Sequence, residues 1–238
     1  MAGQQPDDAG RKLTRQEASD AVTGLGWRYV LGLLRTCVRV DSLAQAAEVA
    51  ARMAAVSGPD SDECLWMDLR RDGLVLSLRS LATGWVTARD VEVAHRISSV
   101  AAELGLATDP DVGGDAPRAV QVLEIAIDAL DIASIRPFWK AVLGYADETG
   151  AAGPEDGLAD PVGQGPTIWF QQMTEPRTQR NRIHFDVSVP HDEAAHRIQA
   201  ALAAGGALIY DAEAPAFWVL ADAEGNEASV TTWQGRDG

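Results

Sequence analysis

The feature that most constrains this chain is an internal repeat in its C-terminal half. A strand-like run begins at Glu124, and the helix-like segment after it ends at Leu143-Gly144. A second strand-like run begins at His184, and its helix, residues 193–204, is followed by two glycines. The repeat predicts a duplicated β-α-β module over about residues 120–233, with further strands after each helix.

Alternation along the two repeated strands sorts their side chains onto two faces. The face expected to pack under the helices carries Leu123, Ile125, Ile127, Ile183, Phe185, Val187 and Val189. The opposite face carries Glu124, Ala126, Asp128, His184, Asp186 and Ser188. The duplication favours a shared concave inner surface that walls a small-molecule pocket, and the alternative is that this polar face meets water.

A polar stretch, TDPDVGGDAPRA, separates this half from the rest of the chain. Its prolines, glycines and aspartates are typical of a linker, which we place at residues 108–119. We expect a disordered arm over residues 1–12, an N-terminal domain over residues 13–107 and a C-terminal domain over residues 120–238.

The N-terminal half alternates helix-like and strand-like segments. Thr14 and Glu17 have capping-box spacing at the start of a short helix. The further segments are strands within 27–40 turning at Gly32, a helix at 42–56, strands at 64–69 and 74–78 joined by Asp72-Gly73, and a helix at 88–104. The order α-β-β-α-β-β-α predicts an α+β fold, with helices on one face of a four-stranded antiparallel sheet.

Charge and cysteine content narrow the classes of function. A net charge of −15 argues against a nucleic-acid partner, because phosphates would be repelled. No apolar run is long enough for a membrane helix, and the N-terminus lacks the pattern of a signal peptide. Cys37 and Cys64 have the spacing neither of a zinc site nor of a disulfide framework, so we expect reduced thiols in the cytoplasm.

The C-terminal half resembles the vicinal-oxygen-chelate superfamily, in its glyoxalase-like branch. The resemblance is carried by FWKAVLGY (138–145), WFQQM (169–173), NRIHFDVSVP (181–190), AALAAGG (200–206) and ADAEGNE (221–227). It implies two βαβββ units in a curved sheet around a cavity. It also implies a divalent metal ion, held by residues from the first and last strands of each unit.

Carried over to this chain, those metal positions fall on Glu124, Gln171, His184 and Ser229. The predicted metal ligands are Glu124, His184 and Gln171, since serine is a poor ligand. Glu227 shares a face with Ser229 and replaces it only if the strand end bends inward. Without a metal ion, His184 and Glu124 are the predicted catalytic pair, as general base and orienting acid. A buried hydrogen-bonded pair without function is the alternative.

The N-terminal half resembles the pterin-4a-carbinolamine dehydratases, through LTRQEA (13–18), the Trp27 strand and GWVTARDVEVAHRI (84–97). The His-His-Pro tripeptide of that family is replaced here by Glu63-Cys64-Leu65. Glu63, Asp62 and Cys64 could in principle replace the imidazoles, and a carboxylate such as Glu63 requires burial to favour its protonated form. A remodelled pocket or a dimerisation platform is the preferred interpretation of this half.

Three hypotheses follow from these patterns. The first is a lyase or isomerase acting on a small molecule in the C-terminal pocket, the second is a pterin dehydratase, and the third is a non-catalytic binding or resistance protein. Beside the catalytic pair, the predicted substrate-binding residues are Trp169, Gln171, Asp186, Trp218, Ser229 and Glu63. Phe217, Trp233 and Met173 are further candidates for the pocket lining. The aromatic side chains point to an apolar or aromatic ligand, and the resemblances imply a homodimer.

Overall fold

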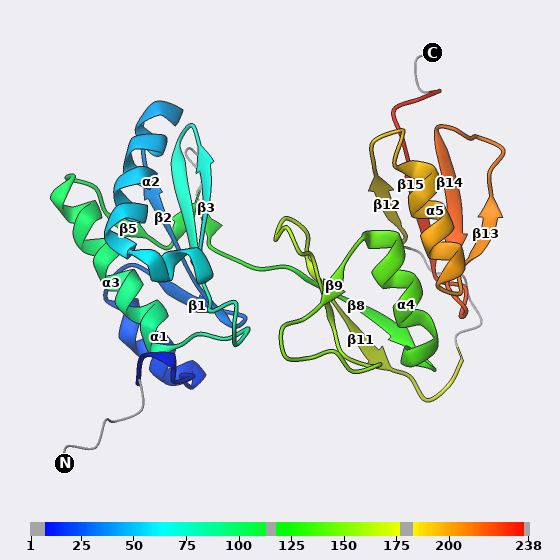
Figure 1. Cartoon of the computed structure of the whole chain (residues 1–238), viewed down its shortest axis with the longest axis horizontal. Helices are drawn as coiled ribbons and strands as arrows, with labels where there is room; N and C mark the ends of the chain where they lie inside the picture. The colour runs from blue at the N-terminus through cyan, green and yellow to red at the C-terminus, as the bar shows by residue number, and fades with distance from the viewer. Residues whose placement is uncertain (1–7, 113–117, 177–182, 236–238) are drawn as a thin grey trace. The chain divides into compact units, whose positions relative to one another are not determined.

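A computed structural model describes residues 8–112, 118–176 and 183–235. The chain divides into two compact units, residues 1–122 and 123–238, each of which mixes helices and strands (Figure 1). The α+β class predicted from the sequence is confirmed. Within the described residues, no helix is both long and apolar enough to cross a membrane.

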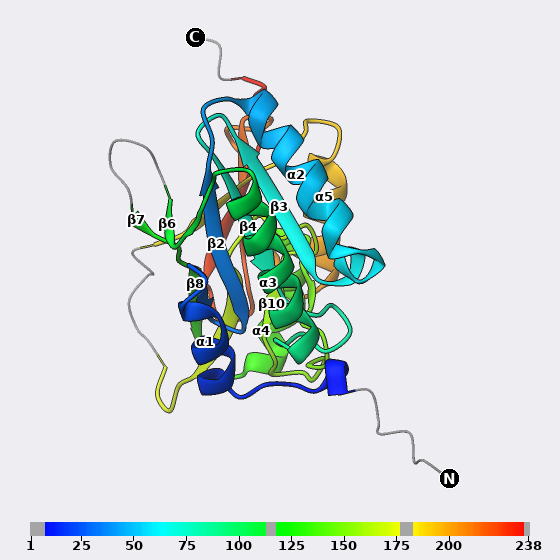
Figure 2. The ribbon, with the colours of Figure 1, turned by 90° about the vertical axis from the view of Figure 1, so that its left-hand side faces the viewer.

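The N-terminal unit has three helices packed on a sheet (Figure 2). Its helices are α1 (Arg15–Thr23), α2 (Leu43–Ser57) and α3 (Ala88–Glu103), with short 3-10 turns η1 (Asp8–Gly10) and η2 (Pro59–Glu63). Its strands are β1 (Arg28–Val30), β2 (Leu33–Arg39), β3 (Leu65–Arg70), β4 (Gly73–Leu78) and β5 (Thr108–Asp109). The sheet order is β1-β2-β4-β3 with antiparallel neighbours, and β5 pairs with β2. The predicted α-β-β-α-β-β-α order is confirmed.

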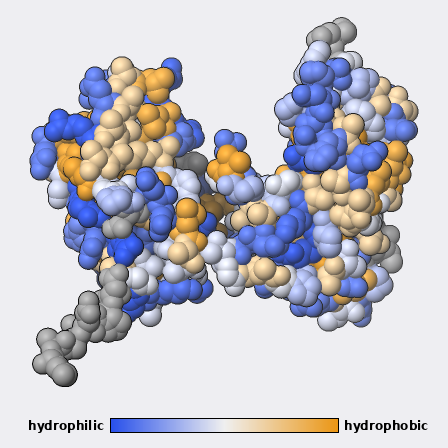
Figure 3. Space-filling model, in the orientation of Figure 1, coloured by the Kyte–Doolittle hydropathy of each residue, from blue (hydrophilic) through white to orange (hydrophobic). Residues whose placement is uncertain are grey.

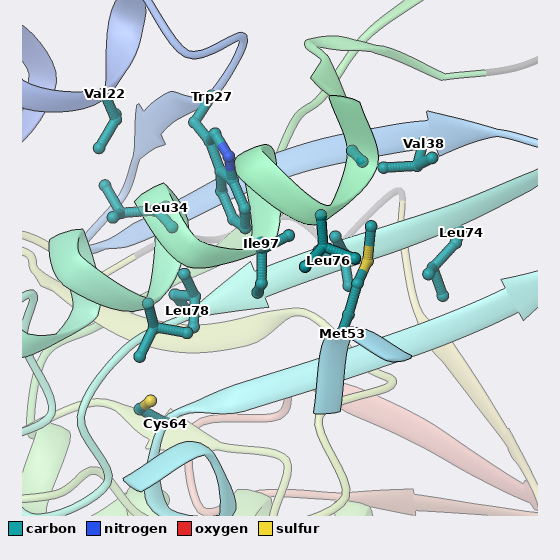
Figure 4. Packing of buried hydrophobic residues seen from close by; sticks show 14 of the residues in the cluster. Val22, Trp27, Leu34, Val38, Met53, Cys64, Leu74, Leu76, Leu78 and Ile97 are labelled. Carbon is teal, nitrogen blue, oxygen red and sulfur yellow. The ribbon is translucent and has the colours of Figure 1, made fainter. Parts of the chain in front are cut away.

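The core of this unit lies between the sheet and the helices. Figure 4 shows Trp27 and Leu34 from the sheet side meeting Ile97 of α3, with Met53 of α2 beside Leu76. Burial of these apolar side chains holds the helices on the sheet. The Trp27 indole also donates a hydrogen bond of 2.9 Å to the Ser98 hydroxyl, so its one polar atom is satisfied.

Three expectations for the N-terminal half need correction. The described part of the expected arm, residues 8–12, is tied down, because Lys12 bridges to Thr87 and the Arg11 carbonyl accepts a hydrogen bond from the Ala88 amide. The β3–β4 turn is at Arg71-Asp72 rather than Asp72-Gly73, since Gly73 already pairs with Arg70. The expected linker contains β5, β6 (Asp111–Val112) and β7 (Arg118–Ala119). Residues 113–117 of the linker and residues 1–7 of the arm lie outside the described residues.

The C-terminal unit consists of two βαβββ modules, as predicted. The first module contains β8 (Glu124–Ala129), α4 (Ile132–Leu143), β9 (Ala146–Asp147), β10 (Leu158–Ala159) and β11 (Thr167–Gln172). The second contains β12 (Phe185–Ser188), α5 (Ala194–Ala203), β13 (Ala207–Tyr210), β14 (Phe217–Ala221) and β15 (Glu227–Thr231). The sheets have the equivalent orders β8-β11-β10-β9 and β12-β15-β14-β13, and in each the first strand is parallel to the last.

Local signals set the ends of the first module's helix. The Asp131 carboxylate caps the start of α4 by accepting from the Ser134 amide, and Gly144 ends it at a φ of 70°, a left-handed conformation that glycine adopts without strain. The two module helices lie side by side (Figure 1) and share one apolar core. In that core the Trp139 ring meets the edge of Phe185 at a centroid distance of 5.6 Å.

The loop between β14 and β15 fastens the second module to the first. The Asp222 carboxylate accepts hydrogen bonds from the Trp139 indole at 2.9 Å and from the Asn226 side-chain amide at 2.7 Å. The Glu224 carboxylate accepts from the backbone amides of Leu130 and Asp131, just before α4. These charge-assisted bonds set the position of β15 relative to α4.

Two residues expected on the apolar face are instead exposed. Leu123 is 61% exposed and Ile183 is 77% exposed, whereas Ile125, Ile127 and Phe185 pack on the core. Both precede the first residue of their strand, so the alternation that buries the later residues does not extend to them. At the outer edge of the second sheet, Figure 3 shows hydrophobic surface over β13, where Leu208, Ile209 and Tyr210 are exposed.

Candidate functional site

A cavity of about 420 Å³ opens on the sheet of the second module. Strands β12, β14 and β15 and the residues just before β12 and β14 supply its walls. The lining residues are His184, Asp186, Ala216, Phe217, Val219, Glu227, Ser229 and Thr231. The volume is within the range of small-molecule sites in proteins.

Strand register explains why these side chains meet. Asp186 pairs with Ser229 across β12 and β15, and Ser229 pairs with Val219 across β15 and β14. The next row along β15 joins Thr231 to Phe217. Residues paired across a sheet project from the same face, so the open face offers polar groups from β12 and β15 beside apolar groups from β14.

His184 and Asp186 form the titratable part of the site. The His184 Nε2 atom lies 3.6 Å from the Asp186 Oδ1 atom, an ion-pair distance that is too long for a hydrogen bond. The two side chains are 55% and 61% exposed, so solvent screens their interaction. Because Nε2 faces the carboxylate, Nδ1 is the nitrogen directed away from it.

The floor of the site is made of two buried hydroxyl residues on β15. The Thr231 hydroxyl is paired with the Ser188 hydroxyl at 2.8 Å. Ser229 is only 5% exposed and lines the cavity, and no hydrogen-bond partner for its side chain is found among the described residues. The Ser229 oxygen is reached from the cavity, so it is available to a ligand group.

The apolar wall comes from β14. Phe217 and Val219 line the cavity, and the Tyr210 ring stacks on Phe217 at a centroid distance of 5.9 Å with 22° between the planes. Trp218, predicted to bind substrate, lies between them in sequence and packs against the core on the opposite face. It does not line the cavity.

Three further predicted site residues lie on the first module. Register pairs Thr167 with Glu124 and Gln171 with Asp128, so Glu124, Trp169 and Gln171 share the outer face of that sheet. All three are exposed, and none of them lines the cavity of the second module. The structure therefore brings together His184, Asp186 and Ser229 of the predicted set and leaves Glu124, Trp169 and Gln171 on another sheet.

The donor set does not fit the predicted divalent metal ion. In the part of the chain that the structure describes, no three His, Cys, Asp or Glu side chains are grouped so that they could hold a metal ion. The cavity offers one imidazole, two carboxylates and hydroxyls, and the first-module ligands Glu124 and Gln171 are not among its lining residues.

The predicted acid of the N-terminal half, Glu63, is exposed at the end of η2. The burial that its proposed role requires is therefore absent. The enclosed carboxylate of this unit is Asp90, which is fully buried at the start of α3 and accepts from the Thr87 amide at 2.6 Å. Burial raises the pKa of Asp90, and the hydrogen bonds from Thr87 oppose that shift.

Three lining residues, Ala216, Val219 and Thr231, were absent from the sequence-based predictions. Thr231 is two positions after Ser229 on the same strand, so the period-two rule could have identified it. Val219 belongs to the run Phe217–Ala221, in which nearly every side chain is apolar, and such a run does not reveal which residues face a cavity.

Comparisons with known proteins agree with this architecture. Residues 124–231 match the family of glyoxalase-like domains. A search of curated proteins found no significant match.

Several solved structures are similar to part of this chain. A glyoxalase/bleomycin resistance protein/dioxygenase family enzyme from Burkholderia phytofirmans is 19% identical over 46% of this chain and 95% of its own, with a TM-score of 0.35. A transcriptional coactivator/pterin dehydratase from Brucella melitensis is 19% identical over 38% of this chain and 99% of its own, with a TM-score of 0.35. A variant of a fosfomycin resistance protein from Listeria monocytogenes, complexed with Mn(II), is 11% identical over 50% of this chain and 98% of its own, with a TM-score of 0.38.

Proposed function

Because residues 124–231 form a glyoxalase-like domain, we propose that this domain binds a small molecule in the second-module cavity and moves a proton on it, as a lyase or isomerase. The observation that carries the proposal is the His184–Asp186 pair at 3.6 Å, which lines the same cavity as the hydroxyl of Ser229. An imidazole, an orienting carboxylate and a hydroxyl on one face are a suitable set for proton transfer.

In the proposed reaction, the Nδ1 atom of His184 takes a proton from a carbon next to a carbonyl group of the substrate. The electron pair of the broken C–H bond moves into the carbonyl, whose oxygen accepts a hydrogen bond from Ser229. Asp186 faces the Nε2–H group and stabilises the imidazolium that forms. An isomerase returns the proton to a neighbouring atom, and a lyase returns it to a leaving group that departs from the adjacent carbon.

Hydrogen–deuterium exchange tests this proposal without knowledge of the natural substrate. The full chain is incubated in D2O with 2-hydroxyacetophenone or its amine analogue 2-aminoacetophenone (phenacylamine), and loss of the proton signal next to the carbonyl is followed by NMR. We expect exchange faster than in buffer, and a loss of about 100-fold or more in His184→Gln. His196→Gln changes an exposed histidine on α5 and is the matched control, for which we expect no loss.

Exchange no faster than in buffer, or an equal loss in both histidine variants, would remove the catalytic proposal. The exposure of His184 and Asp186 favours a second candidate, a non-catalytic binding protein, because the site does not exclude water. That candidate predicts a ligand bound in the cavity without exchange. A pterin dehydratase reaction is not supported at Glu63, because that side chain is exposed.

A further inference from the structure

The three strands that wall the cavity carry different kinds of side chain. β14 presents the apolar groups of Phe217 and Val219, whereas β12 and the residue just before it present Asp186 and His184. β15 lies between these two strands (Figure 1). The aromatic wall and the titratable wall of the cavity are therefore two strand spacings apart, which is roughly 10 Å.

Strand register adds a displacement along the strands. Phe217 pairs with Thr231, whereas Asp186 pairs with Ser229, which is two residues earlier on β15. Two residues of a strand span roughly 7 Å, so the backbones of Phe217 and Asp186 are roughly 12 Å apart on a diagonal across the open face. The His184 imidazole lies 3.6 Å from the Asp186 carboxylate. The aromatic surface and the general base are thus at different ends of one cavity.

A neighbouring ring helps to hold Phe217 in place. Tyr210 of β13 stacks on the Phe217 ring at a centroid distance of 5.9 Å, with 22° between the planes. A side chain that is already packed loses little further freedom when a ligand binds to it. An aryl ring of a ligand can extend this stack, and stacked aromatic rings gain an interaction beyond the burial of apolar area.

We propose that the cavity binds elongated arylalkyl carbonyl compounds in a single direction. The aryl ring lies on Phe217, a short saturated spacer crosses β15, and the carbonyl end lies beside His184 and Ser229. Because the side chains of Phe217 and His184 cover part of the diagonal, a spacer of about two methylene groups is enough to join the two ends. This inference rests on the proposed function, because it names the substrate class of the same cavity.

A series of ketones tests the predicted length. The full chain is titrated by calorimetry with 2-hydroxyacetophenone, 1-hydroxy-4-phenylbutan-2-one and 1-hydroxy-7-phenylheptan-2-one, in which no, two and five methylene groups separate the ring from the carbonyl. We expect the two-methylene ketone to bind about tenfold more tightly than the shortest ketone, because its ring reaches Phe217. The five-methylene ketone should bind no more tightly than that. Affinity that keeps rising with chain length would indicate general apolar binding and would overturn the proposal.

A saturated ring of the same length tests the contact with Phe217. We expect 4-cyclohexyl-1-hydroxybutan-2-one to bind about fivefold more weakly than its phenyl analogue, because it has no aromatic face. Phe217→Leu should remove this difference, and Phe217→Trp should retain it. Leu208→Ala is the control, because it changes an exposed apolar residue of β13 that does not line the cavity. Equal binding of the two analogues by the wild type, or a phenyl preference that survives in Phe217→Leu, would contradict the predicted contact.

The exchange experiment separates this inference from the proposed function. Exchange of all three phenyl ketones that requires His184, without a preference for length or for the phenyl ring, would overturn the substrate class and leave proton transfer standing. A phenyl preference in binding that is retained in His184→Gln, without exchange of any ketone, would support the substrate class and overturn the catalytic role. Absence of detectable binding for every ketone would overturn the substrate class.

Discussion

Asp90 is a carboxylate enclosed at the start of α3 in the N-terminal unit. Its Oδ2 atom accepts hydrogen bonds from the Thr87 amide and hydroxyl, at 2.6 Å and 2.8 Å, while its buried Oδ1 atom has no hydrogen-bond partner among the described residues. Burial raises the pKa of Asp90, so folding favours the protonated carboxyl. The stability that the protonated form contributes is complete below the unfolded pKa and is lost as pH rises through the folded pKa.

We therefore predict that Asp90→Asn reduces the pH dependence of stability. The amide keeps an oxygen that accepts from Thr87 but cannot ionise. Urea unfolding at a series of pH values from about 4 upward should show the wild-type free energy of unfolding falling relative to that of the variant. The exposed substitution Asp20→Asn is the control, and parallel curves for wild type and Asp90→Asn would contradict the prediction.

Ser229 and Thr231 lie on the same strand and differ in their hydrogen bonding. Because no partner for the Ser229 hydroxyl is found among the described residues, Ser229→Ala should change the free energy of unfolding by no more than about 0.5 kcal/mol. Thr231→Val should cost about 1 kcal/mol, because it removes the 2.8 Å bond to Ser188. Denaturant unfolding of both variants checks this, and a Ser229→Ala cost equal to that of Thr231→Val would show that Ser229 is satisfied within the protein.

At the scale of elements, the loop between β14 and β15 helps to hold the second module against α4, in addition to the apolar core that the two modules share. Glu224 accepts from two backbone amides of the first module, and hydrogen bonds to a charged group are stronger than those between neutral groups. We predict that Glu224→Ala lowers the free energy of unfolding by about 2 kcal/mol. Glu224→Gln retains an acceptor oxygen and should lose about half as much.

Thermal unfolding of these two variants is the measurement, with Glu213→Ala as the control. Glu213 lies before β14 and makes no side-chain bond to the first module that is seen in the described residues. A Glu224→Ala midpoint equal to that of Glu213→Ala would show that the loop contact does not stabilise the unit.

At the scale of the whole molecule, each unit has its own hydrophobic core, and the two cores share no residue. We therefore predict that residues 123–238 fold without the N-terminal unit, with a free energy of unfolding on the order of 5 kcal/mol or more. Circular dichroism and cooperative denaturant unfolding of that segment check the prediction. Phe138→Ala, which empties a fully buried position, should lower the stability of the segment by about 3–4 kcal/mol.

Non-cooperative unfolding of the isolated segment would contradict this account.

The homodimer inferred from the two resemblances stays a prediction, as does the cytoplasmic location.

Much of the fold could be predicted from the sequence because its signals are local. Helix ends depend on residues within one helical turn. Examples are the capping box of Thr14 and Glu17 and the helix-ending residue Gly144. The positions of the short strands β9, β10 and β13 were not predicted from the residues, because the stability of these strands comes from pairing with distant strands rather than from their own pattern.

The candidate site divides in the same way. Alternation along each strand determined two things from the sequence alone. His184 and Asp186 project from one face of their strand, and Glu227 and Ser229 project from one face of theirs. Which strands stand next to these was decided only by the tertiary structure. Register across β14 brought Phe217 into the cavity and turned Trp218 to the core, a choice that an apolar run does not encode.

The duplicated module itself was determined by the sequence, because the same order of strand, helix and glycine recurs at a similar spacing along the chain. The tertiary structure decided that the cavity belongs to the second module and that Glu124 and Gln171 lie on a different sheet from His184. The physical reason is that side-chain direction follows from the local backbone, whereas distances between side chains on separate strands follow from packing between segments far apart in the chain.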